Sequence, residues 1–549
     1  MTNNIKLLQS LIEKNHLDAV IITSSDEYNS EYTAGYAKRL QFLTGFSGSN
    51  GTLLLTKSRK ILFTDGRYLL QAKLETQGLE IMDLTKCSVI NFISENLKDH
   101  VITLNPWLHT ESEIIEYNKK NININLFEQN LVDEIWEGQE ERPNSQIFSV
   151  EEFAGKKSSV KIAELIGIMD ADAILLTSSA SICWLLNIRA SDIPYNPVML
   201  GYLILLRDYS YHLFRKNDGL FEMLDSLAGK KIILDPRKTQ SIFTKYLEEK
   251  NIQIIRRDDP VDLPKACKNK VEVANARIAH LRDGAALCKF MHFFANNKEV
   301  LSEYQVAEKL YEFRSSGQDF VTESFAPIVG FCENSSVIHY HPNARDSKLI
   351  EGNGVLLIDS GGQYLQGTTD VTRVIAVGDV LGDDIRKYTL VLKAHIALAT
   401  IIFPRKTNGA QLDGITRANL WREMMDYPHG TGHGVGSFLN VHEGPQSISK
   451  RNLIDIEPGM IISNEPGYYQ EGASGFRIEN LMVVEEYKDG FLKFSNLTMV
   501  PYEERLIDRS MLTPSEIAYI DAYHREVYAN LAELVDEDVR EFLRKVCLG

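Results

Sequence analysis

The segment that most constrains this chain is rich in glycine and holds two histidines, with a third close behind it. Residues 428–436 read PHGTGHGVG, and His442 follows in the run NVHE. Glycine weakens regular elements because it loses more conformational entropy on ordering than other residues do. Such density is tolerated where the backbone approaches something closely or takes a positive φ. His429 and His433 are therefore candidates for metal binding or proton transfer; the alternative is a glycine-rich turn with ordinary surface histidines.

The composition indicates a large globular protein that is not expected to bind nucleic acids or membranes. The chain has 549 residues, and a prior of about 150 residues per domain suggests three or four domains. Hydrophobic residues make up 44% and charged residues 24%, which is ordinary for folded proteins. The formal net charge is −16 and no basic run stands out, so nucleic-acid backbones and anionic membranes are poor partners. No apolar run approaches the ~20 residues that a membrane-spanning helix needs.

The six cysteines are scattered and form no CxxC pair, which favours free thiols in a reducing compartment. The N-terminus shows no basic region followed by an apolar core, so no secretory signal is expected. We therefore expect a soluble, cytoplasmic protein.

Two short apolar segments indicate a repeated domain. Residues 19–25 and 173–179 both read as buried strands that end in polar residues, and the second echoes the first. Polar stretches that contain proline lie near residues 140–159 and 256–264 and suggest domain boundaries. The predicted fold class is α/β (α+β), with two tandem α/β domains, a large C-terminal domain and a helical tail. The predicted domain limits are 1–143, 144–264 and 265–549.

Helices are predicted at three places along the chain. Apolar residues recur at helical spacing in residues 4–15 and again in residues 270–294. A third helix is predicted to begin at Thr513, which is followed by Pro514 and by a glutamate at Glu516 that completes a capping box.

Two aspartates follow or precede apolar strands in the C-terminal part of the chain. Residues 355–358 form an apolar strand that ends on Asp359, and Asp370 begins the run DVTR after a turn signal of two glycines. If these strands form a hairpin, Asp359 and Asp370 face each other on one side of a sheet. Two close carboxylates repel each other unless cations neutralise them, although an aspartate at a strand end or turn is also common for structural reasons.

Two glutamates repeat this pattern. Glu465 follows the apolar strand 460–463, and Glu479 lies inside an otherwise apolar run, where an unpaired carboxylate is costly. Arg477, two residues before Glu479, is a candidate partner for it. Together with His433, the four carboxylates form an oxygen-rich set with one nitrogen, which suits two divalent cations better than a structural zinc site. Two ions about 3.5–4 Å apart can share a bridging hydroxide and polarise a carbonyl, which is hydrolytic chemistry.

These motifs resemble those of the pita-bread metallopeptidases, and among them the Xaa-Pro aminopeptidase (aminopeptidase P) family. The resemblance covers nearly the whole chain, and the length is similar to that of the long, three-domain cytosolic type. It implies two N-terminal domains similar to that of creatinase, followed by a pita-bread catalytic domain. The segments that carry it in the catalytic part are IHY 338–340, LIDSG 357–361, GTTDVTR 367–373, HGTGHGVG 429–436, NVHEGP 440–445, NEPGYY 464–469 and RIEN 477–480.

The resemblance implies a set of metal ligands. Asp359 would hold one ion, Asp370 and Glu479 would bridge both, and His433 and Glu465 would hold the other. Glu465 would also take the proton from the bridging water. The two divalent ions would be manganese, with cobalt, zinc or iron as alternatives.

The resemblance also implies roles for residues around the ligands. His339, His429 and His442 match the non-ligand histidines of the family, which contact the substrate and shuttle protons. Arg477 would orient Asp359, and Tyr469 matches a substrate-binding position near the metals. The remaining candidates, His341, His395 and His524, match no family position, so we expect ordinary surface or packing histidines there.

The implied activity is hydrolysis of the N-terminal Xaa-Pro bond of peptides by a homodimeric enzyme. The amide before proline has no N–H, so the site must select proline by shape and apolar contact. One alternative is a prolidase that cuts only Xaa-Pro dipeptides, although the extra N-terminal domain disfavours it. Others are a non-catalytic pita-bread module that binds peptides and a creatinase-like hydrolase without metal, both of which the intact ligand set disfavours.

Overall fold

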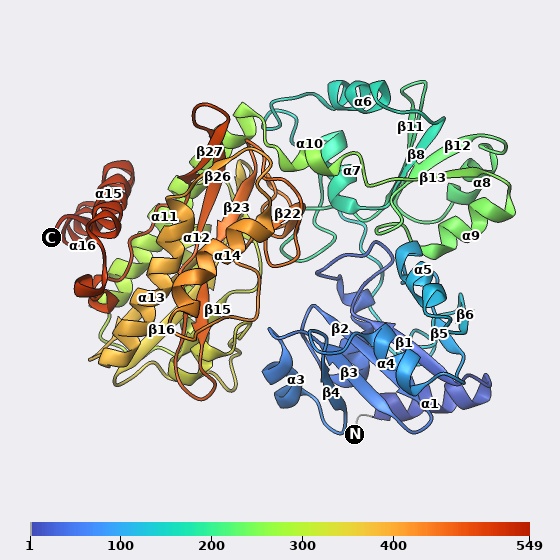
Figure 1. The fold of residues 1–549 in the computed structure, drawn as a ribbon, viewed down its shortest axis with the longest axis horizontal. Helices are drawn as coiled ribbons and strands as arrows, with labels where there is room; N and C mark the ends of the chain where they lie inside the picture. The colour runs from blue at the N-terminus through green and yellow to red at the C-terminus, as the bar shows by residue number, and fades with distance from the viewer. Residues whose placement is uncertain (1–2) are drawn as a thin grey trace. The chain divides into compact units, whose positions relative to one another are not determined.

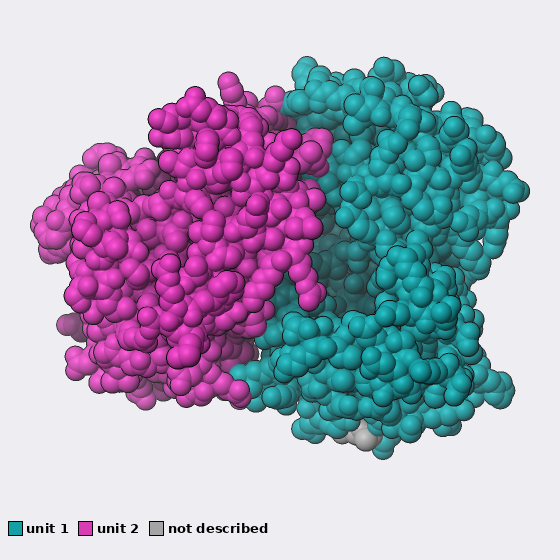
Figure 2. Space-filling model, in the orientation of Figure 1, with its two compact units in different colours: residues 1–151, 156–262 teal, residues 152–155, 263–549 magenta. Residues whose placement is uncertain are grey.

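The structure is a computed structural model that describes residues 3–549, and it divides into two compact units. The first unit comprises residues 1–151 and 156–262, and the second comprises residues 152–155 and 263–549 (Figure 2). No described helix is both long enough and apolar enough to cross a membrane.

The two larger sheets of the first unit have closely related topology (Figure 1). The first sheet has the order β4-β3-β2-β1-β5-β6 and the second has the order β11-β10-β8-β12-β13. In each, a central strand pairs antiparallel with one neighbour and parallel with the other: β1 with β2 and β5, and β8 with β10 and β12. The strands of the first sheet are β1 Ala19–Thr23, β2 Gly51–Thr56, β3 Lys60–Thr64, β4 Glu80–Asp83, β5 Ile102–Leu104 and β6 Ile124–Leu126. Those of the second are β8 Ala173–Leu176, β10 Tyr202–Leu206, β11 Tyr211–Phe214, β12 Lys231–Leu234 and β13 Gln253–Arg256.

The central strands β1 and β8 occupy the two segments that the sequence predicted as repeated strands. Their side chains are almost entirely buried, because helices cover sheets that contain parallel pairs. On the first sheet, α1 (Asn3–Lys14) buries Ile5, Leu8 and Ile12, as its apolar spacing predicted. The prediction of two tandem α/β domains is confirmed, whereas the domain limits at residues 143 and 264 stay predictions.

The second unit is built on antiparallel sheets that present the candidate ligands. A six-stranded sheet has the order β20-β27-β26-β23-β21-β22, and a three-stranded sheet has the order β15-β16-β19. The strands of the larger sheet are β20 Ile402–Pro404, β21 Gly432–Gly434, β22 Glu443–Ile448, β23 Ile461–Asn464, β26 Asn480–Glu486 and β27 Phe491–Asn496. The strands of the smaller sheet are β15 Ile328–Phe331, β16 Gly354–Ser360 and β19 Val371–Val377. The remaining strands of this unit that matter below are β17 Gly362–Tyr364, β18 Gly367–Thr368, β24 Gly467–Tyr469 and β25 Gly475–Arg477.

Helices complete the second unit (Figure 1), namely α11 Lys270–Asn296, α12 Glu303–Ser315, α13 Gly382–Ala399, α14 Gly409–Trp421, α15 Pro514–Leu531 and α16 Glu537–Leu548. The predicted helix over residues 270–294 is α11. The predicted cap of the last helical region is confirmed, since the Thr513 side chain accepts from the Glu516 backbone and completes a capping box. A large apolar cluster joins strands β16 and β19 to α13, α15 and α16, so the sheet that carries the aspartates has a rigid backing.

Candidate metal centre

Five polar side chains at or beside strand ends form the candidate centre. Asp359 lies on β16 and pairs across the ladder with Thr372 on β19, and Asp370 directly precedes β19. The predicted pairing of these two strands is therefore confirmed, although β17 and β18 lie between them in the chain. On the larger sheet, His433 lies on β21, Glu465 follows β23 and Glu479 directly precedes β26.

Three residues of the glycine-rich segment, Gly432–Gly434, form the short strand β21, and the rest of the segment is irregular. A Cβ on Gly432 would lie 1.9 Å from the Ser463 carbonyl oxygen, and one on Gly434 would lie 2.2 Å from that of Glu443. The two strands that flank β21 therefore leave no room for a side chain at either position. None of the glycines in this segment has a positive φ. Of the two reasons for glycine that the sequence suggested, close approach is correct and positive φ is wrong.

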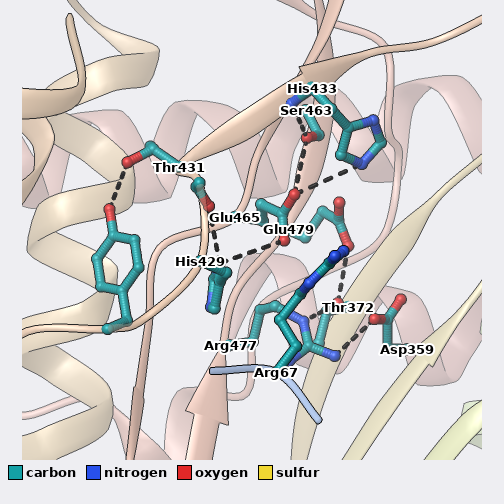
Figure 3. Close-up of polar contacts among 12 residues, drawn as sticks. Arg67, Asp359, Thr372, His429, Thr431, His433, Ser463, Glu465, Arg477 and Glu479 are labelled. Atoms are coloured by element: carbon teal, nitrogen blue, oxygen red, sulfur yellow. Dashed lines mark hydrogen bonds and ion pairs between the residues drawn. The ribbon is translucent and has the colours of Figure 1, made fainter. Parts of the chain in front are cut away.

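The side chains of three candidate ligands converge. Single ligand atoms of Asp370, His433 and Glu479 all lie within 4.8 Å of one another. The His433 Nε2 atom is 3.4 Å from Asp370 Oδ2 and 3.5 Å from Glu465 Oε1 (Figure 3). Its Nδ1 atom lies 2.9 Å from the Gly434 carbonyl oxygen. A carbonyl can only accept, so Nδ1 carries the proton and the Nε2 lone pair faces the carboxylates.

The carboxylates repel one another in this buried setting. Burial raises the pKa of Asp370 well above its usual range, and the charges of Asp359 and Glu465 raise it further. The pKa of Glu479 is raised well above its usual range for the same reasons, first by burial and then by the neighbouring carboxylates. One carboxylate oxygen of Asp359 and one of Asp370 are buried without a hydrogen-bond partner. Orphaned anionic oxygens beside a free imidazole nitrogen fit divalent cations.

Arg477 is the cation of this site and is 2% exposed. Its guanidinium donates to Asp359 Oδ2 at 2.6 Å, to the Tyr469 hydroxyl at 2.7 Å and to Thr372 Oγ1 at 3.1 Å (Figure 3). The sequence suggested Arg477 as a candidate partner for Glu479, but the hydrogen-bonded carboxylate is that of Asp359. The arginine instead orients Asp359, while Thr372 Oγ1 donates to Glu479 Oε2 at 2.8 Å.

His429 and His442 contact other residues of the candidate centre. His429 Nε2 lies 2.8 Å from the Tyr469 hydroxyl, and its Nδ1 lies 3.8 Å from Glu465 Oε2. The ring of His442 stands nearly perpendicular to that of His433, with 4.4 Å between ring centroids. His339 is half-buried and lies just after the 3-10 helix at Cys332–Ser336, which is joined to β25 by a hydrogen bond from the Gly475 amide to Ser335.

Sequence reasoning missed a further histidine that supports the site from behind. His395 on α13 is fully buried, and its Nδ1 lies 3.1 Å from the carbonyl oxygen of Asn464 and 3.2 Å from that of Ile478. These carbonyls belong to the residues just before Glu465 and Glu479. Burial lowers the pKa of His395 to about 3, so the ring is neutral. His395 thus holds two ligand-bearing segments together, which is more than the ordinary packing expected of it.

His341 and His524 show no such arrangement. His341 is exposed, and His524 is buried beside Tyr502, whose backbone amide donates to the histidine Nε2 at 3.0 Å. Two hydroxyl residues near the ligands were also missed. Ser463 Oγ accepts from the His433 amide at 2.9 Å and donates to Glu465 Oε1 at 3.1 Å, and the carbonyl oxygen of Thr431, which directly precedes β21, accepts from the Glu465 amide at 2.8 Å. Their contacts join residues far apart in the chain, so a local pattern does not show them.

Comparisons with known proteins agree with this geometry. Residues 274–486 match the model of metallopeptidase family M24, and residues 490–548 match the C-terminal region of that peptidase. Residues 4–121 and 138–225 each match a creatinase/prolidase N-terminal domain model.

Full-length relatives are similar along the whole chain. A probable Xaa-Pro aminopeptidase P of Laccaria bicolor is 36% identical over 100% of this chain and 93% of the relative. Xaa-Pro aminopeptidase 1 of Dictyostelium discoideum is 36% identical over 98% of this chain and 94% of the relative. The crystal structure of an X-prolyl aminopeptidase from Caenorhabditis elegans, described as a cytosolic enzyme with a di-nuclear active site, matches with a TM-score of 0.95. That match is 30% identical and covers 100% of this chain and 99% of the other.

Proposed function

Because this chain belongs to the Xaa-Pro aminopeptidases of metallopeptidase family M24, we propose that it hydrolyses the bond between the first residue of a peptide and a proline at the second position. The observation that carries the proposal is the convergence of Asp370, His433 and Glu479 within 4.8 Å, in a site where carboxylates outnumber cations. A buried cluster of this kind is costly unless it holds metal ions.

The proposed cofactor is a pair of divalent cations, held by Asp359, Asp370, His433, Glu465 and Glu479. Four carboxylates and one imidazole form an oxygen-rich donor set, which supports manganese ahead of cobalt, iron or zinc. When bound, such a pair polarises a carbonyl and supplies a water that is acidic enough to act as a nucleophile near neutral pH.

Glu465 is the proposed general base. Its side chain is 18% exposed, so a water molecule can reach it, whereas the side chains of Asp370 and Asp359 are 5% and 11% exposed. Its Oε1 accepts from Ser463 and its Oε2 faces His429 Nδ1 at 3.8 Å. The carboxylate is thus held by a hydroxyl on one side, while its other oxygen lies next to the imidazole of His429.

Gly430 and Tyr469 hold His429 in one tautomer. The His429 Nδ1 atom is also 2.7 Å from the Gly430 carbonyl, so the proton sits on Nδ1 and Nε2 accepts from the Tyr469 hydroxyl. Arg477 donates to the same hydroxyl and fixes its position. In this tautomer the Nδ1–H of His429 faces Glu465 as a donor and cannot take its proton. The proton taken up at Glu465 is therefore proposed to pass from Glu465 itself to the leaving proline nitrogen, which must gain a proton when the bond breaks.

Substrate binding is assigned to the remaining side chains. We place the free N-terminal amine near Asp359, and we place His339, His442 and Tyr469 around the scissile carbonyl and the proline ring. The amide before proline offers no N–H, so these groups must recognise shape rather than a donor.

The wider assignments follow from the family. We propose a cytoplasmic homodimer and the domain limits 1–143, 144–264 and 265–549. Support comes from the family matches over residues 4–121, 138–225 and 274–486 and from a relative described as cytosolic.

A peptide panel tests the function. The purified protein is incubated with Arg-Pro-Pro, Gly-Pro and a matched peptide that lacks proline, each with added manganese, and the released first residue is quantified. The proposal expects release from Arg-Pro-Pro and none from the peptide without proline. Cleavage of Gly-Pro alone would indicate a prolidase instead, and no release from any proline peptide would overturn the proposal. Glu479→Gln, which removes one ligand charge at constant shape, is the matched inactive control.

A further inference from the structure

A buried ion pair on α14 is not used by the proposed mechanism. Asp413 and Arg417 lie one helical turn apart, and each is 1% exposed. Arg417 Nε donates to Asp413 Oδ2 at 2.8 Å. Taking two charges out of water costs several kcal/mol per ion, roughly, unless further hydrogen bonds satisfy them. The further partners of this pair lie in residues 426–431, which lead into the glycine-rich segment: Arg417 also donates to Asp426 Oδ1 at 2.6 Å, and the other contacts are to Tyr427, His429 and Thr431.

The aspartate reaches this segment through a hydroxyl. Asp413 Oδ1 accepts from Thr431 Oγ1 at 2.7 Å. The hydroxyl of Thr431, which is labelled in Figure 3, also contacts the hydroxyl of Tyr427. The carbonyl oxygen of Thr431 in turn accepts from the Glu465 amide at 2.8 Å. Asp413 is therefore linked through one residue to the backbone of the proposed general base.

The arginine reaches the segment through its backbone and through an aromatic ring. Arg417 donates to the Tyr427 carbonyl at 2.8 Å and to the His429 carbonyl. The guanidinium carbon lies 3.7 Å above the centroid of the Tyr427 ring, and that centroid is 4.9 Å from the His429 ring. Arg417 thus contacts the backbone on both sides of Pro428 and supports the ring that packs on His429.

There is a physical reason for side chains from another element to hold the glycine-rich segment in place. Fixing one residue of backbone costs about 1–2 kcal/mol of conformational entropy, and glycine costs the most. Every second residue of 430–436 is glycine, so this segment has few side chains that could fix its backbone by their own contacts. A planar guanidinium supplies several donors in fixed directions, so one arginine can hold two carbonyls and a carboxylate at once.

We propose that Asp413 and Arg417 are positioning residues, which set the His429 ring and, through Thr431, the Glu465 backbone for the reaction. Neither residue touches the candidate metal ligands or the proposed substrate groups directly. This inference rests on the proposed function of His429 and Glu465, but the placement itself can be measured without turnover.

The decisive variant removes both charges, because removing Arg417 alone would leave the Asp413 carboxylate buried without a cation. Asp413→Leu/Arg417→Met is compared with the wild type and with Arg422→Met, a matched control at an exposed arginine that follows the same helix. Three quantities are measured: bound metal per chain, amide hydrogen exchange in peptides that cover residues 428–436, and kcat and KM on Arg-Pro-Pro. A displacement of about 1 Å can cost roughly 100-fold in rate.

The proposal expects faster exchange in residues 428–436, retained metal, and a fall in kcat of about 10- to 100-fold that exceeds any change in KM. Unchanged exchange and unchanged kcat in the folded double variant would overturn it. Should the double variant fail to fold, Thr431→Val breaks the Asp413 link at constant shape, and unchanged kcat in that variant would overturn the proposal equally. If the wild type cleaves no Xaa-Pro peptide, the proposed function fails while the exchange data still decide the placement.

Discussion

Replacing Arg477 with methionine tests whether the buried guanidinium organises the metal centre. The change removes three donors at once, those to Asp359, Tyr469 and Thr372. It also removes the buried cation that faces four carboxylates, while the methionine keeps an unbranched side chain of similar length. The Asp359 carboxylate then loses the partner that fixes its orientation, and the hydroxyl that contacts His429 loses its second anchor.

The expected loss of stability and of metal affinity depends on which cations remain to neutralise Asp359. Breaking a buried ion pair by removing one member costs about 3–5 kcal/mol, and we expect destabilisation in this range without metal. With metal bound, the ions themselves neutralise Asp359, so we expect the substitution to lower metal affinity more than it lowers stability. Loss of a group that orients a metal ligand typically costs about 10- to 100-fold in metal affinity or activity, or roughly 1.4–2.8 kcal/mol.

The assay compares metal affinity by isothermal titration, thermal midpoints with and without manganese, and kcat/KM on Arg-Pro-Pro. Arg477→Lys keeps the charge but offers a single ammonium in place of the planar fork, so it should recover only part of the loss. Arg386→Met removes an exposed arginine that pairs with Glu423, and it should change stability by less than about 1 kcal/mol. Wild-type metal affinity and activity in Arg477→Met would refute the reasoning.

Three further predictions follow from the described contacts. Chelation should lower the thermal midpoint, more at pH 8 than at pH 5, because the raised pKa values of Asp370 and Glu479 make ionisation costly without cations; equal loss at both pH values would contradict this. Asp26→Asn in the first unit should stabilise the protein at pH 8, and by about half as much at pH 5. Burial raises the Asp26 pKa from 3.8 to about 6, so its contribution to stability is present below pH ~4 and is lost as pH rises through about 6, by up to ~3 kcal/mol. Urea midpoints at both pH values measure it, and a shift that is the same at pH 5 and pH 8 would count against it. His395→Phe should lower the thermal midpoint, because it leaves two buried carbonyls unpaired at a cost of about 1–3 kcal/mol for each lost partner. His341→Phe, at an exposed site, should not lower it. Equal midpoints for the two variants would show that the His395 contacts do not stabilise the protein.

The sequence predicted the ligand-bearing strands because each has a local signal. An apolar run that ends on a carboxylate, as at Asp359 and Glu465, predicts both a strand and the candidate ligand at its end. Membership of the Xaa-Pro aminopeptidase family and the tandem α/β domains are confirmed, and the two sheets repeat one pairing scheme about β1 and β8. The roles of the individual site residues remain proposals.

The supporting residues could not be predicted from local patterns. His395 bonds to two backbone carbonyls, and a carbonyl carries no residue-specific signal. Asp413 and Arg417 stand four residues apart on a helix, which in a sequence is indistinguishable from an exposed surface pair. Only the packing of α14 on the glycine-rich segment gives that pair its partners. The sequence suggested close approach as a reason for the glycines, but it did not show that β21 pairs with β22 and β23.

The most direct measurement is anomalous diffraction from crystals of this protein grown with manganese. The account predicts two peaks about 3.5–4 Å apart, both in contact with the carboxylates of Asp370 and Glu479, and one beside His433 Nε2. A single peak, or manganese bound away from these side chains, would contradict it.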